Sequence, residues 1–313
     1  QPQSILNKKS GISSKLNVDV MYYKSAADGN DGAYDFKAKP DYPFDVPGKG
    51  AAVPEVYSGS VFTEVRVVVD AASSVVQRMR LYRTEPHLEV ITSLGPIDIK
   101  DNIGKNVILR VASDVRSDGK FLVDSNALEM IEHTRGLWKF GQKPGTSPGK
   151  NYYPIVAMAA IRDAKSAMFV FTDKPEGAGS QNDGQVEAMI YRRLLKGDGK
   201  GMDEPLNTTV PITTTHWVLF DSVDRATTKS RQSAQRMFNP PIVFAKTNFE
   251  GTPAQAWAPM TSALPENVVI QNLQVFLANW SGTAEQCDVC YIPPPSGRVP
   301  AKESPADPTS LPN

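Results

Sequence analysis

The side chains that most often carry metal or nucleophilic chemistry are scarce in this sequence, with three His and two Cys among 313 residues. His87, His133 and His216 stand far apart, and no two of them have the spacing typical of metal ligands. No serine lies in the setting of a nucleophile elbow. We therefore expect each histidine to be a structural or surface residue, and we expect neither a catalytic residue nor a metal site in this chain.

Cys287 and Cys290 form a C-x-x-C pair, a pattern shared by redox, zinc and disulfide chemistry. A redox cysteine is activated at the N-terminus of a helix, but the three prolines at 293–295 prevent a helix directly after the pair. A zinc site would need two further ligands at close spacing, and none lies nearby. The pair is therefore more typical of a local disulfide or of plain thiols, and a redox or metal role is the open alternative.

Two sequons, at Asn207 and Asn279, match the acceptor pattern for N-linked glycans, which has a meaning only in a secretory protein. The first ten residues contain no hydrophobic signal core, so on this interpretation Gln1 is a processed N-terminus. The sequons predict a secreted protein or one that passes through the secretory pathway.

Charge and hydropathy argue against nucleic-acid binding and against a membrane-spanning helix. The 34 Lys and Arg residues balance the 34 Asp and Glu residues, and a nucleic-acid-binding protein would need a surplus of cations. The apolar stretches stop short of the roughly 20 residues that a membrane helix requires. We expect no nucleic acid partner and no membrane span.

The elements that must position any site are predicted to be strands, because apolar and polar residues alternate with a period of two in many short segments. Clusters of Gly, Pro, Asp and Asn separate the segments, and 25 prolines disfavour a helical fold. Together they predict an all-β protein built as a sandwich or as a larger antiparallel assembly. The alternating segments are 16–22, 61–69, 75–82, 88–94, 107–111, 167–172, 186–191 and 215–220.

One helix and one tail depart from this pattern. The sequence predicts a short helix over 227–238, which the Asn-Pro-Pro at 239–241 ends. Residues 293–313 are rich in proline and small polar residues, which is typical of an exposed flexible tail without a core.

Several motifs in a consistent order resemble the C-terminal β region of glycoside hydrolase family 38, the retaining α-mannosidases of lysosome, vacuole and Golgi. The resemblance spans about residues 3–280, and the series is more specific than any one motif. The motifs are Gly-Ala-Tyr-Asp-Phe at 32–36, Phe-Leu-Val-Asp-Ser-Asn at 121–126, Asn-Tyr-Tyr-Pro at 151–154, Gly-Ala-Gly-Ser at 177–180 in place of a family turn, and Tyr-Arg-Arg-Leu-Leu-Lys at 191–196.

The resemblance implies a large β-supersandwich of the galactose-mutarotase type over residues 1–245. It further implies a C-terminal β subdomain over 246–292, before the tail at 293–313. Beyond Trp280 the sequence diverges from the family, so the last strands of the family are expected to be missing or rebuilt.

The resemblance also implies an enzyme whose catalytic half is not in this chain. In the family, the aspartate nucleophile, the acid/base carboxylate and the zinc ligands belong to an N-terminal α/β domain. This chain alone is therefore expected to be inactive and to bind no zinc. Its expected partners are an N-terminal catalytic subunit of the same enzyme and mannose-containing glycans, in the lysosome, in the vacuole or outside the cell.

Three residues are candidates for contact with the sugar by resemblance. Tyr34 would offer a phenolic hydroxyl, and Arg192 and Arg193 would form a pocket edge, through a side chain or a backbone carbonyl. Since adjacent residues of a strand point to opposite faces, only one of the two arginine side chains can face the pocket. The alternative function is a non-catalytic β-sandwich of this family that binds a glycan or a protein without turnover.

Overall fold

The computed structural model describes residues 3–26, 32–33, 35–47, 53–70, 75–137, 147–197, 201, 204–241, 262 and 265. Residues Gln1–Ile242 form one compact unit, and Val243–Asn313 form a second unit. Only Ser262 and Pro265 of the second unit are described. The C-terminal subdomain expected over 246–292 and the tail expected over 293–313 lie outside the described residues and stay predictions.

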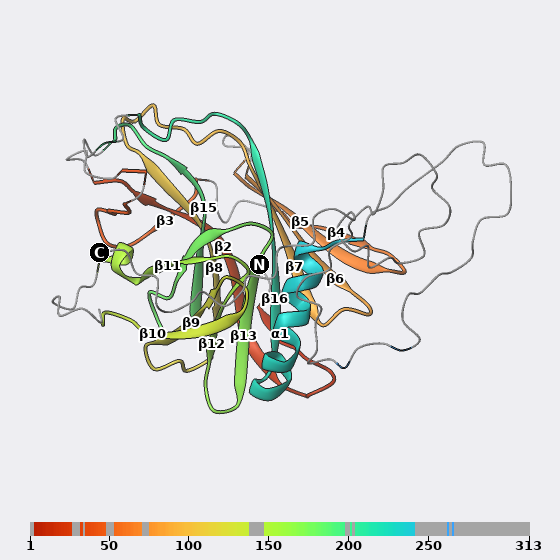
Figure 1. Cartoon of the computed structure of the whole chain (residues 1–313). Coiled ribbons are helices and arrows are strands. Elements are labelled where there is room, and N and C mark those ends of the chain that lie inside the picture. The colour runs from red at the N-terminus through yellow and green to blue at the C-terminus, as the bar shows by residue number, and fades with distance from the viewer. Residues whose placement is uncertain are drawn as a thin grey trace, which may run out of the picture. The chain divides into compact units, whose positions relative to one another are not determined.

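The first unit contains two antiparallel sheets packed face to face, with one helix on an outer face (Figure 1). Seven described strands form one sheet, in the order β1-β2-β8-β15-β14-β11, with β3 paired to β2. These strands are β1 Ser4–Leu6, β2 Ser13–Lys24, β3 Phe44–Asp45, β8 Lys105–Ser113, β11 Tyr152–Ile155, β14 Glu176–Gly179 and β15 Gln185–Arg193.

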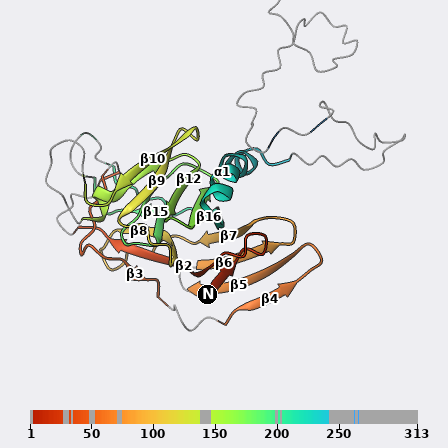
Figure 2. The same cartoon turned by 90° about the horizontal axis from the view of Figure 1, so that it is seen from below.

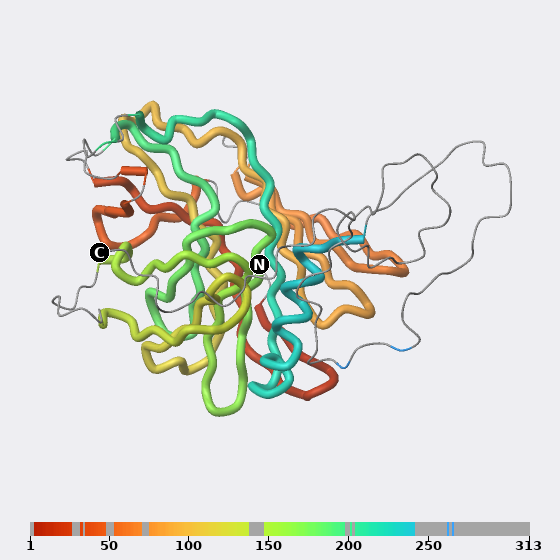
Figure 3. Tube along the Cα trace, viewed as in Figure 1, coloured from red at the N-terminus to blue at the C-terminus, as the bar shows by residue number. Residues whose placement is uncertain are grey.

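Nine described strands form the other sheet, in the order β10-β9-β12-β13-β16-β7-β6-β5-β4. The chain passes repeatedly from one sheet to the other, as the tube of Figure 3 shows. These strands are β4 Glu55–Ser58, β5 Phe62–Asp70, β6 Val75–Tyr82, β7 His87–Leu94, β9 Lys120–Ser125, β10 Glu129–Thr134, β12 Met158–Arg162, β13 Ser166–Thr172 and β16 Ile212–Ser222.

The main core lies between the two sheets and follows from the alternation of apolar residues. Leu16, Val18 and Val20 of β2 are fully buried, and the polar residues between them are on the opposite face. They pack with inward residues of the facing sheet such as Val218 and Phe220 of β16. The predicted all-β class and antiparallel sandwich are confirmed, and each of the eight alternating segments falls within or overlaps a strand.

The helix α1 runs from Val223 to Phe238 and packs on the outer face of the nine-stranded sheet, against β13 and β16. Its buried Ala226 and Ala234 join Phe171 and Leu219 in a second core. The helix begins one turn earlier than the predicted start at 227. Ser222, a residue type common at the N-cap, directly precedes Val223 and is the sequence signal for this earlier start.

A buried carboxylate joins two parts of the nine-stranded sheet. Oδ1 of Asp124, at the end of β9, accepts hydrogen bonds at 3.0 Å from the backbone N–H groups of Val156, Ala157 and Met158. Its Oδ2 accepts a hydrogen bond of 2.7 Å from the N–H of Ala127 in the following turn. This side chain therefore fixes both the turn after β9 and the segment that enters β12.

Candidate functional site

Arg192 and Arg193 end strand β15 and lie opposite Asn106 and Lys105 of β8, after a bulge between Met189 and Tyr191. The two arginine side chains contact different segments of the chain, as expected for neighbours in a strand. What each guanidinium binds decides which of them is available to a ligand.

The guanidinium of Arg192 holds the loop that precedes residue 36. It donates to the carbonyl oxygens of Ala33 (2.9 Å), Gly32 (3.2 Å) and Asp35 (2.7 Å). Its Nε donates to Oδ1 of the fully buried Asn106 at 2.6 Å. At least four hydrogen bonds to the protein engage this side chain, so a sugar contact by Arg192 would have to use its backbone.

Phe36 anchors the other end of the same loop. Its ring makes edge contacts with Tyr23 and Tyr152, at centroid distances of 5.3 Å and 5.1 Å. A Cβ on Gly149 would lie 2.1 Å from the carbonyl oxygen of Phe36, so only glycine allows this close packing. Tyr34, the candidate between the two anchors, lies outside the described residues, and its contact with a sugar stays a prediction.

Arg193 binds the segment that follows β15. Its Nε donates to Oδ1 of Asn207 at 2.9 Å, and its Nη1 donates to the carbonyl oxygen of Ile97 at 2.6 Å. The backbone N–H of Leu194 donates to the carbonyl oxygen of Leu206 at 2.8 Å. Residues 204–210 therefore lie alongside the end of β15.

Two cavities flank this end of β15. One, of about 460 Å³, is lined by residues 189–192 and 205–208 and is wide open to solvent. The other, of about 220 Å³, is lined by Leu194, Leu195 and Lys196 together with residues 24–26, 102–104 and Lys39. Arg192 thus borders the first cavity, and residues 194–196 border the second.

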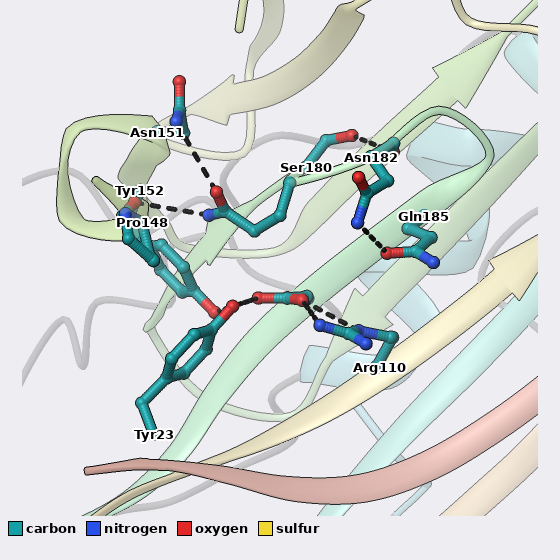
Figure 4. Close-up of polar contacts among 10 residues, drawn as sticks. Tyr23, Arg110, Pro148, Asn151, Tyr152, Ser180, Asn182 and Gln185 are labelled. Carbon is teal, nitrogen blue, oxygen red and sulfur yellow. Dashed lines mark hydrogen bonds and ion pairs between the residues drawn. The ribbon is translucent and has the colours of Figure 1, made fainter. Parts of the chain in front are cut away.

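A buried charge network that includes Tyr23, Arg110 and Tyr152 lies on the outer face of the seven-stranded sheet (Figure 4). The carboxylate of Glu187 is fully buried; Oε1 accepts two hydrogen bonds from Arg110, that from Nε being 2.8 Å long. Oε2 accepts hydrogen bonds from the hydroxyls of Tyr152 at 2.8 Å and Tyr23 at 3.0 Å. Burial, followed by the Glu187 charge, raises the pKa of both tyrosines, so both phenols remain protonated donors.

The Asn-Tyr-Tyr-Pro motif supports the same region through Asn151 (Figure 4). Oδ1 of Asn151 accepts a hydrogen bond of 2.7 Å from the N–H of Gly136, and Gln181 links Nδ2 of Asn151 to the carbonyl oxygen of Pro148. The carbonyl oxygen of Asn151 lies 2.2 Å from where a Cβ on Gly179 would be. The segment 177–180, expected as a turn, is strand β14 as far as Gly179, because its glycines let it pack tightly against β11.

Two of the histidines are buried in structural contacts. Nε2 of His216 lies 3.0 Å from Oε2 of Glu176, and Nδ1 lies 3.1 Å from the hydroxyl of Thr214. His87 stacks on Trp217 at a centroid distance of 4.0 Å, and burial lowers its pKa to about 4. His87 therefore stays neutral near pH 7 and is held by packing.

The third histidine, His133, also has a structural contact. His133 stacks on Tyr153 of the Asn-Tyr-Tyr-Pro motif, at 3.7 Å between ring centroids. Within the described ranges, no group of three or more His, Cys, Asp or Glu residues could hold a metal ion. The described residues therefore do not fit the zinc ion of the family.

The other sequence candidates divide between exposed and undescribed positions. Asn207 is exposed, and its Oδ1 accepts the hydrogen bond from Arg193; its glycosylation stays a prediction. Asn279, Cys287 and Cys290 lie outside the described residues. In the described part of the chain, no helix is both long and apolar enough to cross a membrane.

Sequence reasoning missed Glu187, Arg110 and Asn106, which form the base of this region. Glu187 stands at a polar position of an alternating strand, a pattern that indicates a solvent-exposed face. In the structure, the loop 35–40 and the turn before β11 cover that face. Phe36 and Ala38 of the loop pack on Tyr23 and Ile108. No local signal marks the covered face, because the covering segments are distant in sequence.

Comparison with known proteins places these features in a family. The sequence profile of the glycosyl hydrolases family 38 C-terminal domain matches residues 3–200. The chain belongs to this family. Two of the motifs that resemble this family have structural roles. The motif at 121–126 acts through the hydrogen bonds of Asp124, and the motif at 151–154 acts through those of Asn151.

The family 38 relatives are much longer than this chain. It is 31% identical over 290 residues to the lysosomal alpha-mannosidase of Dictyostelium discoideum, an alignment that covers 87% of this chain and 28% of the relative. It is 32% identical to the Bos taurus enzyme, over 83% of this chain and 27% of the relative. It is 35% identical to the Homo sapiens enzyme, over 65% of this chain and 21% of the relative. The chain thus spans about a quarter of these relatives.

A solved family 38 structure shares the fold. An alpha-mannosidase from Enterococcus faecalis V583 superposes with a TM-score of 0.57, over 75% of this chain and 29% of that chain. Its sequence identity of 12% means that the likeness concerns the fold alone.

Proposed function

We propose that this chain is the C-terminal part of a retaining α-mannosidase that hydrolyses α-mannosides of N-glycans. The observation that carries the proposal is the match to lysosomal alpha-mannosidases at 31% to 35% identity, over regions that form only 21% to 28% of those enzymes. The chain acts in the lysosome, in the vacuole or outside the cell, and sequons at Asn207 and Asn279 serve as glycan acceptors.

The proposed role of the chain is to form one wall of the mannose pocket. Tyr34 donates or accepts a hydrogen bond with the sugar, and the backbone at Arg192 and Arg193 forms the pocket edge. The loop before Phe36 and the open cavity beside 189–192 support this assignment, because they bring the two motifs together at the end of β15.

The chemistry itself is assigned to an N-terminal catalytic subunit. A retaining glycosidase uses one carboxylate as nucleophile and a second as acid and then base, about 5–5.5 Å apart. In the family these carboxylates and the zinc ion, which holds the mannose hydroxyls, belong to the N-terminal part. The chain alone therefore binds substrate incompletely and does not turn it over.

The test compares three preparations on a chromogenic α-mannoside: this chain alone, the N-terminal part alone, and the two together. Activity is expected only for the pair and is expected to be lost on chelation of zinc. Tyr34→Phe in the pair is expected to lower kcat/KM by about 5- to 150-fold, the effect of losing 1–3 kcal/mol of hydrogen bonding. Tyr42→Phe, at an exposed tyrosine, is the matched control. Glycan binding by the pair without turnover would support the non-catalytic alternative instead.

A further inference from the structure

We propose that Arg192 is a positioning residue, whose guanidinium fixes the main chain on both sides of Tyr34. This inference rests on the proposed function, in which Tyr34 contacts the sugar. It assigns to the Arg192 side chain a role distinct from substrate contact.

The hydrogen bonds of Arg192 flank position 34 in the sequence. Two of the three carbonyl acceptors, on Gly32 and Ala33, precede Tyr34, and the third, on Asp35, follows it. These bonds span 157 to 160 residues of sequence and join β15 to the loop. A single planar group thus holds the backbone immediately before and after the proposed sugar contact.

The guanidinium is itself held in place from below. Asn106 lies directly across from Arg192 in the β8–β15 pairing, is fully buried, and accepts the hydrogen bond from Nε at 2.6 Å. Nδ2 of Asn106 in turn lies 3.5 Å from the hydroxyl of Ser25. Because Nε is fixed, the other nitrogens of the planar fork point at the loop in one orientation, which the flexible ammonium of a lysine cannot reproduce.

The second anchor of the loop, Phe36, follows Tyr34 in the sequence. Phe36 packs on Tyr23 and Tyr152, but neither ring contacts the residues that precede position 34 through any described interaction. Without the Arg192 guanidinium, the carbonyls of Gly32 and Ala33 lose their side-chain donor. The carbonyl oxygen of Gly32 then still accepts the 3.2 Å hydrogen bond from the N–H of Asp35, but the hydrogen bonds that join Gly32 and Ala33 to β15 are lost.

The experiment is a double-mutant cycle in the complete enzyme, with Tyr34→Phe, Arg192→Lys and the two combined. Arg192→Lys keeps the positive charge and most of the side-chain volume, and it removes the planar guanidinium with its several N–H donors. Each single variant is expected to lower kcat/KM for a chromogenic α-mannoside by about fivefold or more. The combined variant is expected to lie within about twofold of Tyr34→Phe alone, because interacting residues are not additive. Arg162→Lys, at an exposed ion pair, is the charge-matched control.

A second measurement does not depend on activity or on Tyr34. Hydrogen exchange of the peptide that contains 32–36 is expected to be faster in Arg192→Lys than in the parent enzyme, and unchanged in Arg162→Lys. Asn106→Ser, which removes the acceptor for Nε, is expected to accelerate exchange in the same peptide. It serves in place of Arg192→Lys if that variant does not assemble.

The outcomes distinguish the positioning role of Arg192 from the sugar contact proposed for Tyr34. Equal and independent losses from Tyr34→Phe and Arg192→Lys, or unchanged exchange at 32–36, would overturn the positioning role. If Tyr34→Phe has no effect on kcat/KM while exchange at 32–36 accelerates in Arg192→Lys, Arg192 does position the loop. In that case it is the sugar contact of the proposed function that fails.

Discussion

At the scale of single residues, the carboxylate of Glu187 binds three partners in a fully buried position. Arg110 neutralises its charge, and the hydroxyls of Tyr23 and Tyr152 occupy the second oxygen. Partial loss of such a network is costly, because removal of one member takes a hydrogen bond from a buried carboxylate. The same tyrosines pack on Phe36, so the network also supports the loop next to the candidate site.

Glu187→Ala is expected to lower the free energy of unfolding by about 3–5 kcal/mol, because it takes the carboxylate partner from the Arg110 guanidinium, whose side chain is only 14% exposed. Glu132→Ala is the matched control, since its partners Lys120 and Arg162 are exposed, and its cost is expected to stay within about 1 kcal/mol. Urea denaturation of the complete enzyme measures both. Equal costs for the two variants would contradict a structural role of the buried pair.

His87 makes stability depend on pH. Burial lowers its pKa to about 4, so between the ordinary value of 6.5 and pH 4 the unfolded chain binds a proton that the folded chain does not. Stability therefore falls as the pH drops through this window, by about 3 kcal/mol in total for a shift of this size.

His87→Phe keeps the ring that stacks on Trp217 and removes the titrating group. We expect its melting temperature to fall less than that of the parent protein between pH 6.5 and 4, with a constant difference between the two above pH 7. Parallel melting curves across the acid range would show that the contribution of His87 is absent.

At the scale of elements, β14 shows how two glycines in one strand differ in their tolerance to substitution. A Cβ on Gly179 would lie 2.2 Å from the carbonyl oxygen of Asn151, whereas a Cβ on Gly177 would lie 3.5 Å from the Tyr152 ring, an ordinary contact. The strand sits between β11 and β15, so the clash at Gly179 would separate the Asn-Tyr-Tyr-Pro segment from the sheet.

Gly179→Ala is therefore expected to destabilise the protein by about 1–3 kcal/mol, the usual cost of overpacking. Gly177→Ala is expected to be neutral or to stabilise by about 0.5–1 kcal/mol, because alanine loses less backbone entropy in a strand. Thermal unfolding of the two variants side by side checks the difference. The assigned packing of β14 on β11 would be wrong if alanine were tolerated equally at both positions.

At the scale of the whole molecule, the β4 end of the nine-stranded sheet carries exposed apolar side chains. Strand β4 is an edge strand (Figure 2), and all four of its residues are exposed. The pairings of β4, β5 and β6 put Val56 and Leu81 on the same sheet face as Met79 of the main core. Val56 is 62% exposed and Leu81 is 56% exposed. An edge of this kind favours association with another polypeptide.

The isolated chain is accordingly expected to self-associate. The paired substitutions Val56→Lys and Leu81→Lys are expected to increase the monomer fraction in size-exclusion chromatography with light scattering, because charge on an edge strand opposes pairing. Leu128→Lys, at an exposed apolar residue of the β9–β10 turn, is the control and is expected to leave association unchanged. A parent chain that is monomeric at all concentrations would contradict this expectation.

The sequence by itself determined the strands, the sandwich and the family. Alternation with a period of two is a local property, so segments such as 16–22 and 186–191 could be assigned to strands without knowledge of their neighbours. The order of short motifs identified glycosyl hydrolase family 38, which the profile match over 3–200 confirms.

Only the tertiary structure decided what the motif residues do. Arg192 was expected to form a pocket edge, and its acceptors at 32, 33 and 35 lie too far away in sequence for any local pattern to reveal them. Glu187 stands at a polar position of an alternating strand, and the segments that bury it come from other parts of the chain. The physical reason is the same in both cases: spacing along a strand fixes which face a side chain is on, whereas long-range packing decides what that face meets.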